Sequence, residues 1–346
     1  MIRSFSARVD VLRGGVKYKQ LLFAESSPPT IMADKSSAIK MSLAGTFLHD
    51  PDIDYLTDEL RPAIVVNGVE SALGVFPIGS VVSSSRISGT VYDRIEAYDR
   101  ALILNQCKTE ELLHFPAGTN YLTAVGQLLT KAGIAQTSEV PTTHTLATDR
   151  EDWEIGTSYL TIINALLAEI NYSDIWFDAH GIAMLQPYQE PSAQRIKHRY
   201  NAEDPLTILQ PETSSELDIY DAPNVFIAIV SNPDLSGPMT ATAVNDNPTS
   251  RRSTVRRGRR IPHVVRVDNI ASQTELQAYV NNLAYQSMLS GEVVTAKTLA
   301  EGGHGVGDVV AVTHPQVTGI FEETAWSMSL AAGRTMTHEW QRVVYV

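Results

Sequence analysis

Cysteine is almost missing from this 346-residue chain, in which Cys107 is the only one. A single thiol forms no disulfide within the chain and leaves no cysteine cluster to hold a metal ion. Cys107 ends an apolar stretch that begins at residue 101, so we predict a small buried side chain rather than a nucleophile.

Long apolar runs are missing too. No run approaches the ~20 residues that a membrane-spanning helix requires. Residues 1–6 lead into alternating apolar and polar positions, whereas a secretory signal has a continuous apolar centre. We therefore expect no stable membrane binding and no export through the general secretory route.

The sequence also lacks the motifs of enzymes and cofactor sites. The one glycine cluster, residues 302–308, has no Lys-Ser/Thr of a phosphate-binding loop and precedes a strand pattern, which favours a tight turn. No H-E-x-x-H motif and no G-x-S-x-G elbow occurs. Short spacings join His180 to Asp178 and His304 to Asp308, and we predict both histidines to be exposed turn residues. No catalytic residue, metal site or cofactor is therefore expected.

Acidic side chains outnumber basic ones by 39 to 27, which gives a formal net charge of −12. This charge disfavours a protein that grips nucleic-acid phosphates over its whole surface. One stretch is nevertheless strongly basic, and its arginines are Arg251, Arg252, Arg256, Arg257, Arg259 and Arg260. No aromatic side chains for stacking on bases lie between them. Such a run can bind nucleic acid or an anionic surface, but we favour pairing of these arginines with carboxylates of a neighbouring subunit.

The first part of the chain has the patterns of a β domain. Apolar and polar residues alternate over residues 5–12, which is the period of a half-buried strand. Asn67-Gly68 stands between β-branched residues and supplies the two positive-φ positions of a type I′ hairpin turn. Residues 88–98 give a further alternating strand. Several short strands at this spacing indicate a small barrel or sandwich.

The middle of the chain combines helices with short strands. Apolar residues recur every three or four positions over residues 121–132 and 157–170, which predicts two amphipathic helices. Ser158 is the predicted N-cap of the second helix. Two short strands around a turn follow over residues 175–186. These elements predict a compact α+β domain.

The rest of the chain is polar and rich in proline as far as residue 224, and then β-rich. A strand at residues 225–231 and a helix at residues 272–289 precede several short strands. The predicted class is α+β, mostly β. The predicted segments are a β domain at 1–108, an α+β domain at 109–190, a connection at 191–224 and a β domain with one long helix at 225–346.

The final third carries an ordered set of short motifs. They are Val230-Ser231-Asn232-Pro233-Asp234, Asn247-Pro248-Thr249-Ser250, Ser253-Thr254-Val255, Arg257-Gly258-Arg259-Arg260-Ile261-Pro262, Val306-Gly307-Asp308-Val309-Val310 and Gly333-Arg334-Thr335-Met336-Thr337-His338. This order resembles the baseplate-hub and tail-tip proteins of phages, prophages and related contractile particles. The segment 159–184 and the hairpin residues 67–76 are similar to the same family, so the resemblance covers essentially the whole chain.

The resemblance implies a structural, non-enzymatic hub subunit that forms a homotrimer. Residues 1–108 and 225–346 are then two β-barrel-like tube domains, and three copies form a ring that joins the tail tube to the spike or tip. The implied partners are the tail tube protein, the spike protein, and the tape measure and baseplate wedge proteins, with DNA only passing through the lumen. The implied location is the virion tail or baseplate, after synthesis in the bacterial cytoplasm.

Two other functions stay open. One is a tail-associated cell-wall hydrolase, which would use the carboxylates of residues 149–154 with His180, or a Ser/His/Asp triad assembled across the fold. The other is a receptor- or carbohydrate-binding tail protein, in which sugars would stack on Trp153, Trp176, Trp326 and Trp340. We predict instead that residues 149–154 form a solvated loop and that the tryptophans pack in cores.

Overall fold

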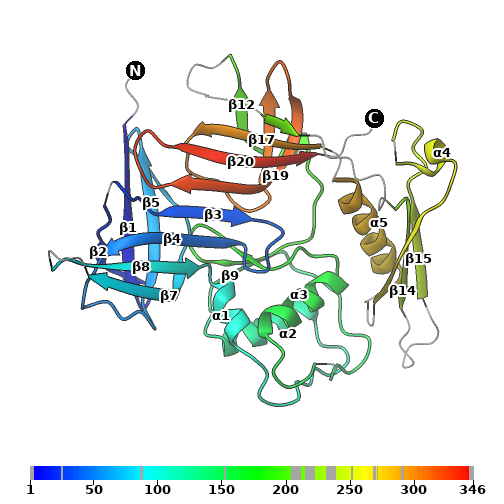
Figure 1. Ribbon diagram of the computed structural model, residues 1–346. Helices are drawn as coiled ribbons and strands as arrows, with labels where there is room; N and C mark the ends of the chain where they lie inside the picture. The colour runs from blue at the N-terminus through cyan, green and yellow to red at the C-terminus, as the bar shows by residue number, and fades with distance from the viewer. Residues whose placement is uncertain are drawn as a thin grey trace.

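The structure is a computed structural model in which a β-rich body carries two lobes (Figure 1). One lobe, which contains α1 to α3, lies below the body in Figure 1, and the other, with α5, lies at the right. The structure describes residues 4–24, 26–85, 89–151, 153–203, 212–214, 223–230, 239–250, 252–267, 270, 272–289 and 292–342.

The N-terminal β region is antiparallel. Its strands are β1 (Phe5–Arg13), β2 (Val16–Leu21), β3 (Thr30–Asp34), β4 (Met41–Leu48), β5 (Glu59–Val66), β6 (Val69–Ala72), β7 (Phe76–Ser85) and β8 (Val91–Tyr98). Val9 and Val11 on β1 are fully buried, as predicted, but Asp10 and Leu12 on the opposite face are buried too, so the strand is covered on both faces there. Asn67 and Gly68 have φ angles of 51° and 82° between β5 and β6, which confirms the predicted type I′ hairpin.

Strand β3 joins the two ends of the chain. It pairs with β4 on one side and with β19 (Thr318–Ser329) on the other, where residues 30–34 lie opposite residues 325–329. The other C-terminal strands of this sheet are β12 (Ile196–Asn201), β13 (Glu212–Ser214), β17 (Glu292–Leu299), β18 (Val309–Thr313) and β20 (Thr335–Arg342). The main path of the sheet runs β13-β17-β20-β19-β3-β4-β8-β7-β5-β1-β2.

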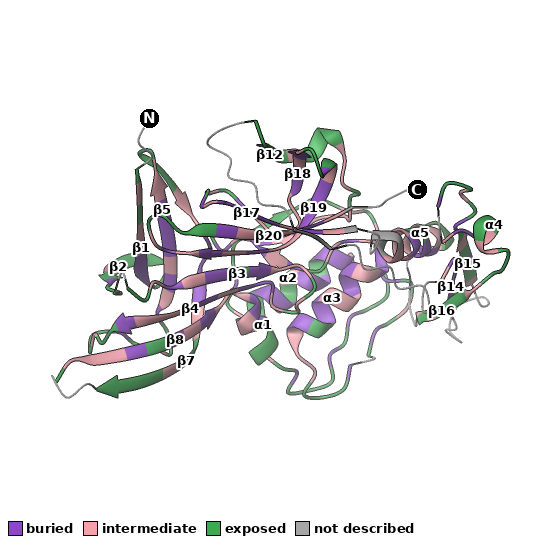
Figure 2. Ribbon diagram, turned by 45° about the horizontal axis from the view of Figure 1, so that its top comes forward, coloured by how far each residue is buried: buried purple, intermediate pink, exposed green. Residues whose placement is uncertain are grey.

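The predicted α+β, mostly β class is confirmed, but the arrangement as two barrels is not. Within the described residues no sheet closes on itself, and β3 pairs on both edges so that the two β regions form one open sheet. One apolar core spans this join, since Ile31 and Leu43 pack in the same cluster as Trp326 and Met328. Figure 2 shows the hairpin of β7 and β8 projecting from the body with much of its length exposed.

The lower lobe contains the predicted helices and strands, with two additions, a short helix and a third short strand. Its elements are α1 (Ala101–Gln106), α2 (Tyr121–Lys131), β9 (Thr137–Glu139), α3 (Tyr159–Glu169), β10 (Trp176–Phe177) and β11 (Ala183–Leu185). The Ser158 hydroxyl accepts a hydrogen bond from the backbone N–H of Thr161, which confirms the predicted N-cap. The helix α1 was not predicted, because six residues are too few to show helical periodicity. Its last turn is followed by Cys107, which is only half-buried.

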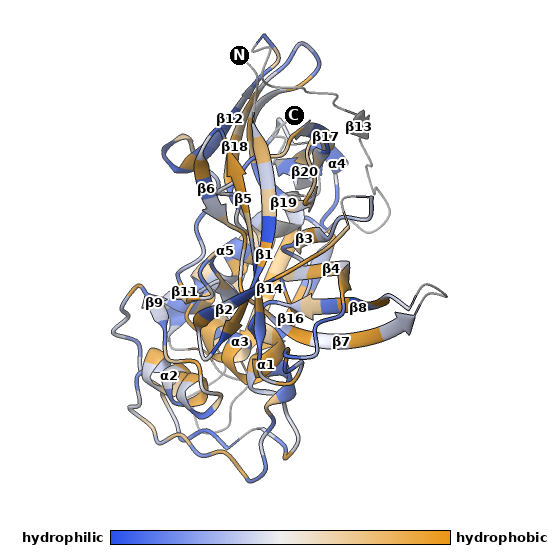
Figure 3. Ribbon diagram, turned by 90° about the vertical axis from the view of Figure 1, so that its left-hand side faces the viewer, coloured by the Kyte–Doolittle hydropathy of each residue, from blue (hydrophilic) through white to orange (hydrophobic). Residues whose placement is uncertain are grey.

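The helices of this lobe bury an apolar core around one ionic group. Figure 3 shows apolar residues concentrated on α1 and α3. Inside the lobe, Arg150 donates to both carboxylate oxygens of Glu169 at 2.9 and 2.7 Å, and the Tyr121 hydroxyl donates to Glu169 at 2.8 Å. The Arg150 and Glu169 side chains are only 5% and 8% exposed. Such a pair is costly to break, because a lone charge would remain in the core.

The right-hand lobe is a small sheet with one long helix. Its elements are β14 (Val225–Val230), β15 (Met239–Val244), α4 (Thr254–Arg257), β16 (Pro262–Val267) and α5 (Gln273–Leu289). The strand order is β15-β14-β16, and Phe226 and Ala228 of β14 pack with Leu276 and Val280 of α5. His144 Nε2 lies 3.2 Å from a carboxylate oxygen of Glu275, so a polar contact links the two lobes.

Some boundaries differ from those predicted. The tail segments 318–321 and 326–330 belong to one long strand, β19, which a bulge between Glu323 and Ala325 distorts. The strand predicted at residues 343–345 lies outside the described residues. A short 3₁₀ helix covers Ala193–Arg195 within the predicted connection. In the part of the chain that is described, no helix has the length and apolarity to span a membrane.

We expect the substitution Glu169→Ala to lower the free energy of unfolding by about 3–5 kcal/mol, because it leaves the buried Arg150 without its carboxylate. Urea unfolding followed by far-UV circular dichroism measures this loss. Glu139→Ala removes an exposed carboxylate of the same lobe and should change stability little. Equal stability of the two variants would show that the buried pair does not hold the lobe together.

Candidate functional site

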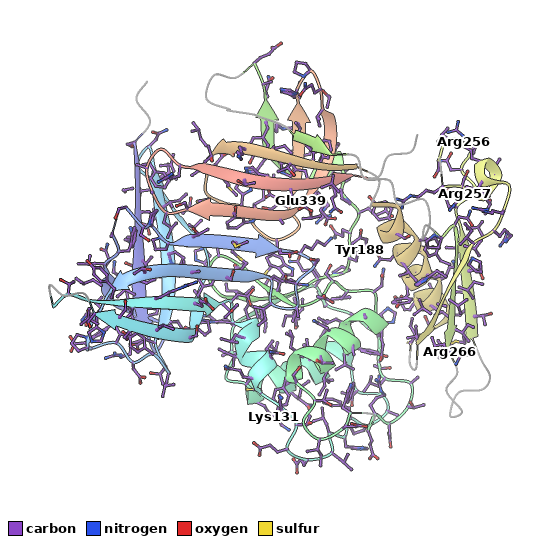
Figure 4. The ribbon with its side chains drawn as sticks, viewed as in Figure 1. Lys131, Tyr188, Arg256, Arg257, Arg266 and Glu339 are labelled. Atoms are coloured by element: carbon purple, nitrogen blue, oxygen red, sulfur yellow. The ribbon has the colours of Figure 1, made fainter. Side chains whose placement is uncertain are left out.

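The basic segment of the sequence forms a loop between β15 and β16, which we call the arginine loop (residues 252–261). It contains the single turn of helix α4. Figure 4 shows Arg256 and Arg257 at the upper end of the right-hand lobe, away from the body. The site is therefore a projection of a small lobe rather than a cleft.

A buried asparagine fixes the two ends of the arginine loop. Asn224 is 0% exposed, and its amide donates to the carbonyl oxygens of Arg252 at 3.2 Å and Arg259 at 3.0 Å. Its side-chain oxygen accepts from the backbone N–H of Ile261 at 2.7 Å. Because buried backbone groups need partners, one side chain satisfies three groups of the loop at once.

The helical turn inside the loop is capped at both ends. The Ser253 hydroxyl, fully buried, accepts from the backbone N–H of Arg256 at 3.2 Å. Gly258 ends the turn with φ 62°, a left-handed conformation that glycine adopts without strain. Asn245 adds a further support, since its backbone oxygen accepts from Thr254 N–H at 2.9 Å. The loop is therefore held by its own caps and by hydrogen bonds with Asn224 and Asn245 outside it.

The arginines of this loop are not all used in the same way. Arg256, Arg259 and Arg260 are exposed, and no described acidic side chain forms an ion pair with them. Arg252 instead reaches back to α5 and donates to the Ser287 carbonyl oxygen at 3.1 Å. Arg251 of the predicted set lies outside the described residues.

A second cluster lies buried in the C-terminal part of the large sheet, and we call it the histidine network. It consists of His198 and Tyr200 on β12, Thr298 on β17, His304 and Asp308 in the turn before β18, Glu323 and Trp326 on β19, and His338 and Trp340 on β20. The carboxylate of Glu323 stands at its centre and is 1% exposed. It contacts His304 Nδ1 at 2.6 Å and His338 Nδ1 at 2.5 Å.

Hydrogen bonding fixes the protonation of these groups. An ionised carboxylate only accepts, so both histidines carry a proton on Nδ1. Burial raises the pKa of Glu323, but the hydrogen bonds from His304 and His338 outweigh this effect and lower that pKa to about 2. Burial also raises the pKa of Tyr200, so its hydroxyl stays protonated and donates to His304 Nε2 at 3.0 Å. Burial lowers the pKa of His338 below its ordinary value.

Three residues of this network have metal-ligating chemistry, but their spacing is that of hydrogen bonds. His304, Glu323 and His338 bring their ligand atoms close together, as do His198, Glu301 and His304. Bond lengths of 2.0–2.2 Å around tetrahedral zinc place neighbouring ligand atoms roughly 3.3 Å apart, well beyond the 2.5 and 2.6 Å found at Glu323. The rings of His198 and His304 stack in parallel, 3.8 Å apart, so their lone pairs do not converge on one ion. We assign no metal to the network.

Of the two histidines that the sequence predicted to be exposed in turns, one is buried. His180 is exposed in a turn that Asp178 organises by accepting from two backbone N–H groups, as predicted. His304 was also predicted to be exposed, but it is 6% exposed and pairs with Glu323 rather than Asp308. The predicted turn at residues 302–308 is confirmed between β17 and β18, and it carries His304 into the core.

Two pairs of residues in the sequence, each at a spacing of two positions, could have indicated the histidine network. His198 and Tyr200 are two residues apart on β12, and His338 and Trp340 are two residues apart on β20. Residues at this spacing lie on the same face of a strand, so each pair presents two hydrogen-bonding rings to one core. Nothing in the sequence indicated that the two strands belong to the same sheet.

The residues suggested for catalysis or sugar binding are used in other ways. The charged run 149–154 is a loop in which Asp149 accepts from Ala117 N–H, and Asp152 lies outside the described residues. The tryptophans Trp153, Trp326 and Trp340 are at most 8% exposed, which confirms core packing for them. Trp176 is half-buried.

One serine, one histidine and one aspartate do meet in the N-terminal β region. Ser83 Oγ lies 2.5 Å and His49 Nδ1 2.8 Å from oxygens of the buried Asp93. Tyr55 donates to the same carboxylate. A nucleophilic triad needs the serine on the histidine and the histidine on the aspartate, whereas here both donate to the aspartate. The arrangement fastens the β7–β8 hairpin to residues 49–55.

Comparisons with known proteins give matches by structure alone. No protein-family model matches the sequence, and no curated protein matches it. Over 97% of its length the chain is similar to a tail protein from Neisseria meningitidis, with 15% identity, 97% of that chain covered and a TM-score of 0.67. The chain has the fold of a phage tail protein.

Two further structures support this fold assignment. A 43 kDa tail protein of prophage MuSo2 from Shewanella oneidensis is 10% identical, with 97% of this chain and 98% of that one covered and a TM-score of 0.67. A component of the E. coli type VI secretion system, itself structurally similar to the T4 tail proteins gp27 and gp5, is also 10% identical. All of this chain and 77% of that one are covered, with a TM-score of 0.55. The predicted resemblance to phage tail proteins is thus found in the fold.

We expect Asn224→Ala to lower the free energy of unfolding by about 1–3 kcal/mol, because it leaves buried backbone groups of the arginine loop unsatisfied. Amide hydrogen exchange should become faster at residues 252–261. Thr249→Ala, an exposed change nearby, serves as the control. Unchanged exchange in the Asn224 variant would mean that the loop does not depend on this side chain.

We also expect the contribution of the histidine network to the free energy of unfolding to decrease as the pH falls below about 6.5. The pKa values of His338 and Glu323 are both lowered in the folded chain, so the unfolded chain binds more protons below pH 6.5 for the histidine and below pH 4.5 for the carboxylate. Urea unfolding between pH 7.5 and 5 gives the free energy of unfolding as a function of pH. The substitution His338→Gln should make the slope of this function less steep, by at most about 1.4 kcal/mol per pH unit for one proton. The exposed His180→Gln variant should keep the wild-type slope, and identical slopes in all three proteins would contradict the expectation.

Proposed function

We propose that this chain is a structural, non-enzymatic subunit of the hub of a phage tail or tail-derived particle, in which three copies form a ring between the tail tube and the spike or tip. The observation that carries the proposal is the extent of the structural likeness. Two tail proteins share the fold over 97% of this chain and nearly all of their own. Since a fold alone does not establish a function, assembly is the property to test.

In this proposal, residues 1–108 form one tube domain, and the part of 225–346 that belongs to the large sheet, β17 to β20, forms the second. The α+β domain at 109–190 lies outside the tube, and residues 191–224 connect the two parts. The pairing of β3 with β19 supports a common wall, because it fixes the N- and C-terminal β regions in one sheet. The proposed partners are the tail tube and spike proteins, with the tape measure and baseplate wedge proteins as further neighbours.

The charge of the chain supports a conduit. A net charge of −12 on each copy would disfavour adhesion of DNA to the wall of a ring built from several copies. DNA would then pass through the lumen without being held. The proposed location is the tail or baseplate of the particle, after synthesis in the bacterial cytoplasm.

The two alternative functions gain less support from the described residues. A carbohydrate-binding surface would need exposed aromatic rings, and Trp153, Trp326 and Trp340 are buried. A hydrolase would need a relay of proton transfer, and the Ser83–Asp93–His49 group has the aspartate rather than the histidine in the middle.

Light scattering on the purified chain is expected to give about three times the mass of 37.9 kDa, and antibodies to the chain should detect it in purified tails. A zymogram on cell-wall substrate is expected to show no clearing. Absence of the chain from assembled tails would refute the hub proposal, and clearing of the substrate would favour the hydrolase.

A further inference from the structure

Charge is divided unevenly between the lobes. Residues 109–190 contain eleven acidic and two basic side chains, a net charge of −9. Residues 225–289 contain seven basic and four acidic side chains, a net charge of +3. One molecule thus carries a strongly acidic lobe and a basic lobe, so the basic lobe of one copy attracts the acidic lobe of another.

The acidic charge is concentrated on two loops that lie side by side, residues 108–118 and 145–158. Bridges from Lys108 to Ser158 and from Phe115 to Arg150 align them antiparallel, and we call the pair the acidic ribbon. Its exposed carboxylates are those of Glu110, Glu111, Asp149, Glu151 and Glu154. Between them stand two apolar side chains that are unusually exposed, Leu112 at 66% and Ile155 at 63%. Exposed apolar groups within a charged rim are typical of a contact surface.

The arginine loop has the opposite charge and the same layout. Its helical turn presents Val255, which is 61% exposed, beside the exposed Arg256 and the exposed pair Arg259 and Arg260. The hydrogen bonds from Asn224 and Ser253 hold the loop in place, so little conformational freedom remains to be lost on binding. The two surfaces are therefore opposite in charge, and each has exposed aliphatic side chains at its centre.

The two surfaces cannot meet within one molecule. Figure 1 places α4 at the upper right and the loops of the lower lobe, which include the acidic ribbon, at the bottom. The lobes are also fixed to each other at a different point, where His144 meets Glu275 and Asn282 donates to Asn171 at 3.0 Å. A partner for the arginine loop must come from another molecule.

We propose that the arginine loop of one copy docks on the acidic ribbon of the next copy, with Val255 against Leu112 and Ile155 and the arginines against the surrounding carboxylates. The inference rests on the proposed function, since it presumes that several copies assemble. Because the two surfaces differ, the contact is heterologous, and repeating it builds a ring where the rotation between copies closes, instead of pairing two copies about a twofold axis. Exposed ion pairs are screened by salt, so the contact weakens as ionic strength rises.

Charge reversal tests the pairing in the full chain. The triple substitution Arg256→Glu, Arg259→Glu and Arg260→Glu should weaken self-association by roughly tenfold or more in sedimentation velocity at low salt, because it sets like charges against each other. Adding Glu110→Arg, Glu111→Arg and Glu154→Arg to the same chain should restore it. The control, Lys131→Glu with Arg334→Glu, changes exposed basic residues elsewhere and should leave association intact.

Cross-linking tests the geometry. In a Cys107→Ser background, a Leu112→Cys chain mixed with a Val255→Cys chain should be joined by a short bis-maleimide, whereas neither chain alone should form cross-linked dimers. Cross-links within either single population would overturn the heterologous arrangement.

Other outcomes separate this inference from the hub proposal. Association that is insensitive to both charge reversals would overturn the docking, while incorporation of the same variants into tails would leave the hub function standing. A wild-type chain that stays monomeric at low salt would also overturn the docking. Retention of the wild-type chain on immobilised DNA, lost in the triple arginine variant, would assign the loop to nucleic acid instead.

Discussion

The pairing of β3 with β19 is the constraint on which the rest of the structure depends. It makes residues 30–34 neighbours of residues 325–329 and so places both β regions in one sheet. The same strand β19 carries Glu323 toward the histidine network and Trp326 toward the core shared with the N-terminal region. A shift of one residue in this pairing would turn both side chains to the opposite face.

The sequence predicted well those elements whose signals are local. The Asn67-Gly68 hairpin follows from the preference of Asn-Gly for the two positive-φ positions of a type I′ turn, and the N-cap at Ser158 follows from its position before a periodic apolar run. The long-range pairing of β3 could not be predicted from the sequence, because a five-residue strand with apolar residues does not specify its partner. The expectation of two separate barrels was not confirmed for this reason.

The candidate sites show the same division. The arginines are evident in the sequence, and so is their excess of charge. The hydrogen bonds that support the loop are not evident in the sequence, because Asn224 lies 28 residues before Arg252 and looks like an ordinary loop asparagine. His304 was misplaced because a glycine-rich turn suggests exposure, whereas this turn returns its histidine to the core beneath Glu323. Whether a polar residue in a loop is buried depends on which hydrogen-bonding partners the neighbouring strands place beside it.

The distance along the chain between the two halves of the β3–β19 pair also has a consequence for synthesis. During translation β3 is made early, but its second edge stays unpaired until residues 325–329 have left the ribosome. An open edge strand is a template for pairing with other chains. The nascent protein therefore carries an unpaired strand edge until β19 has been synthesised and covers it. Chains that stop early would keep this edge open and would be removed by aggregation or proteolysis before they could compete for a place in an assembly.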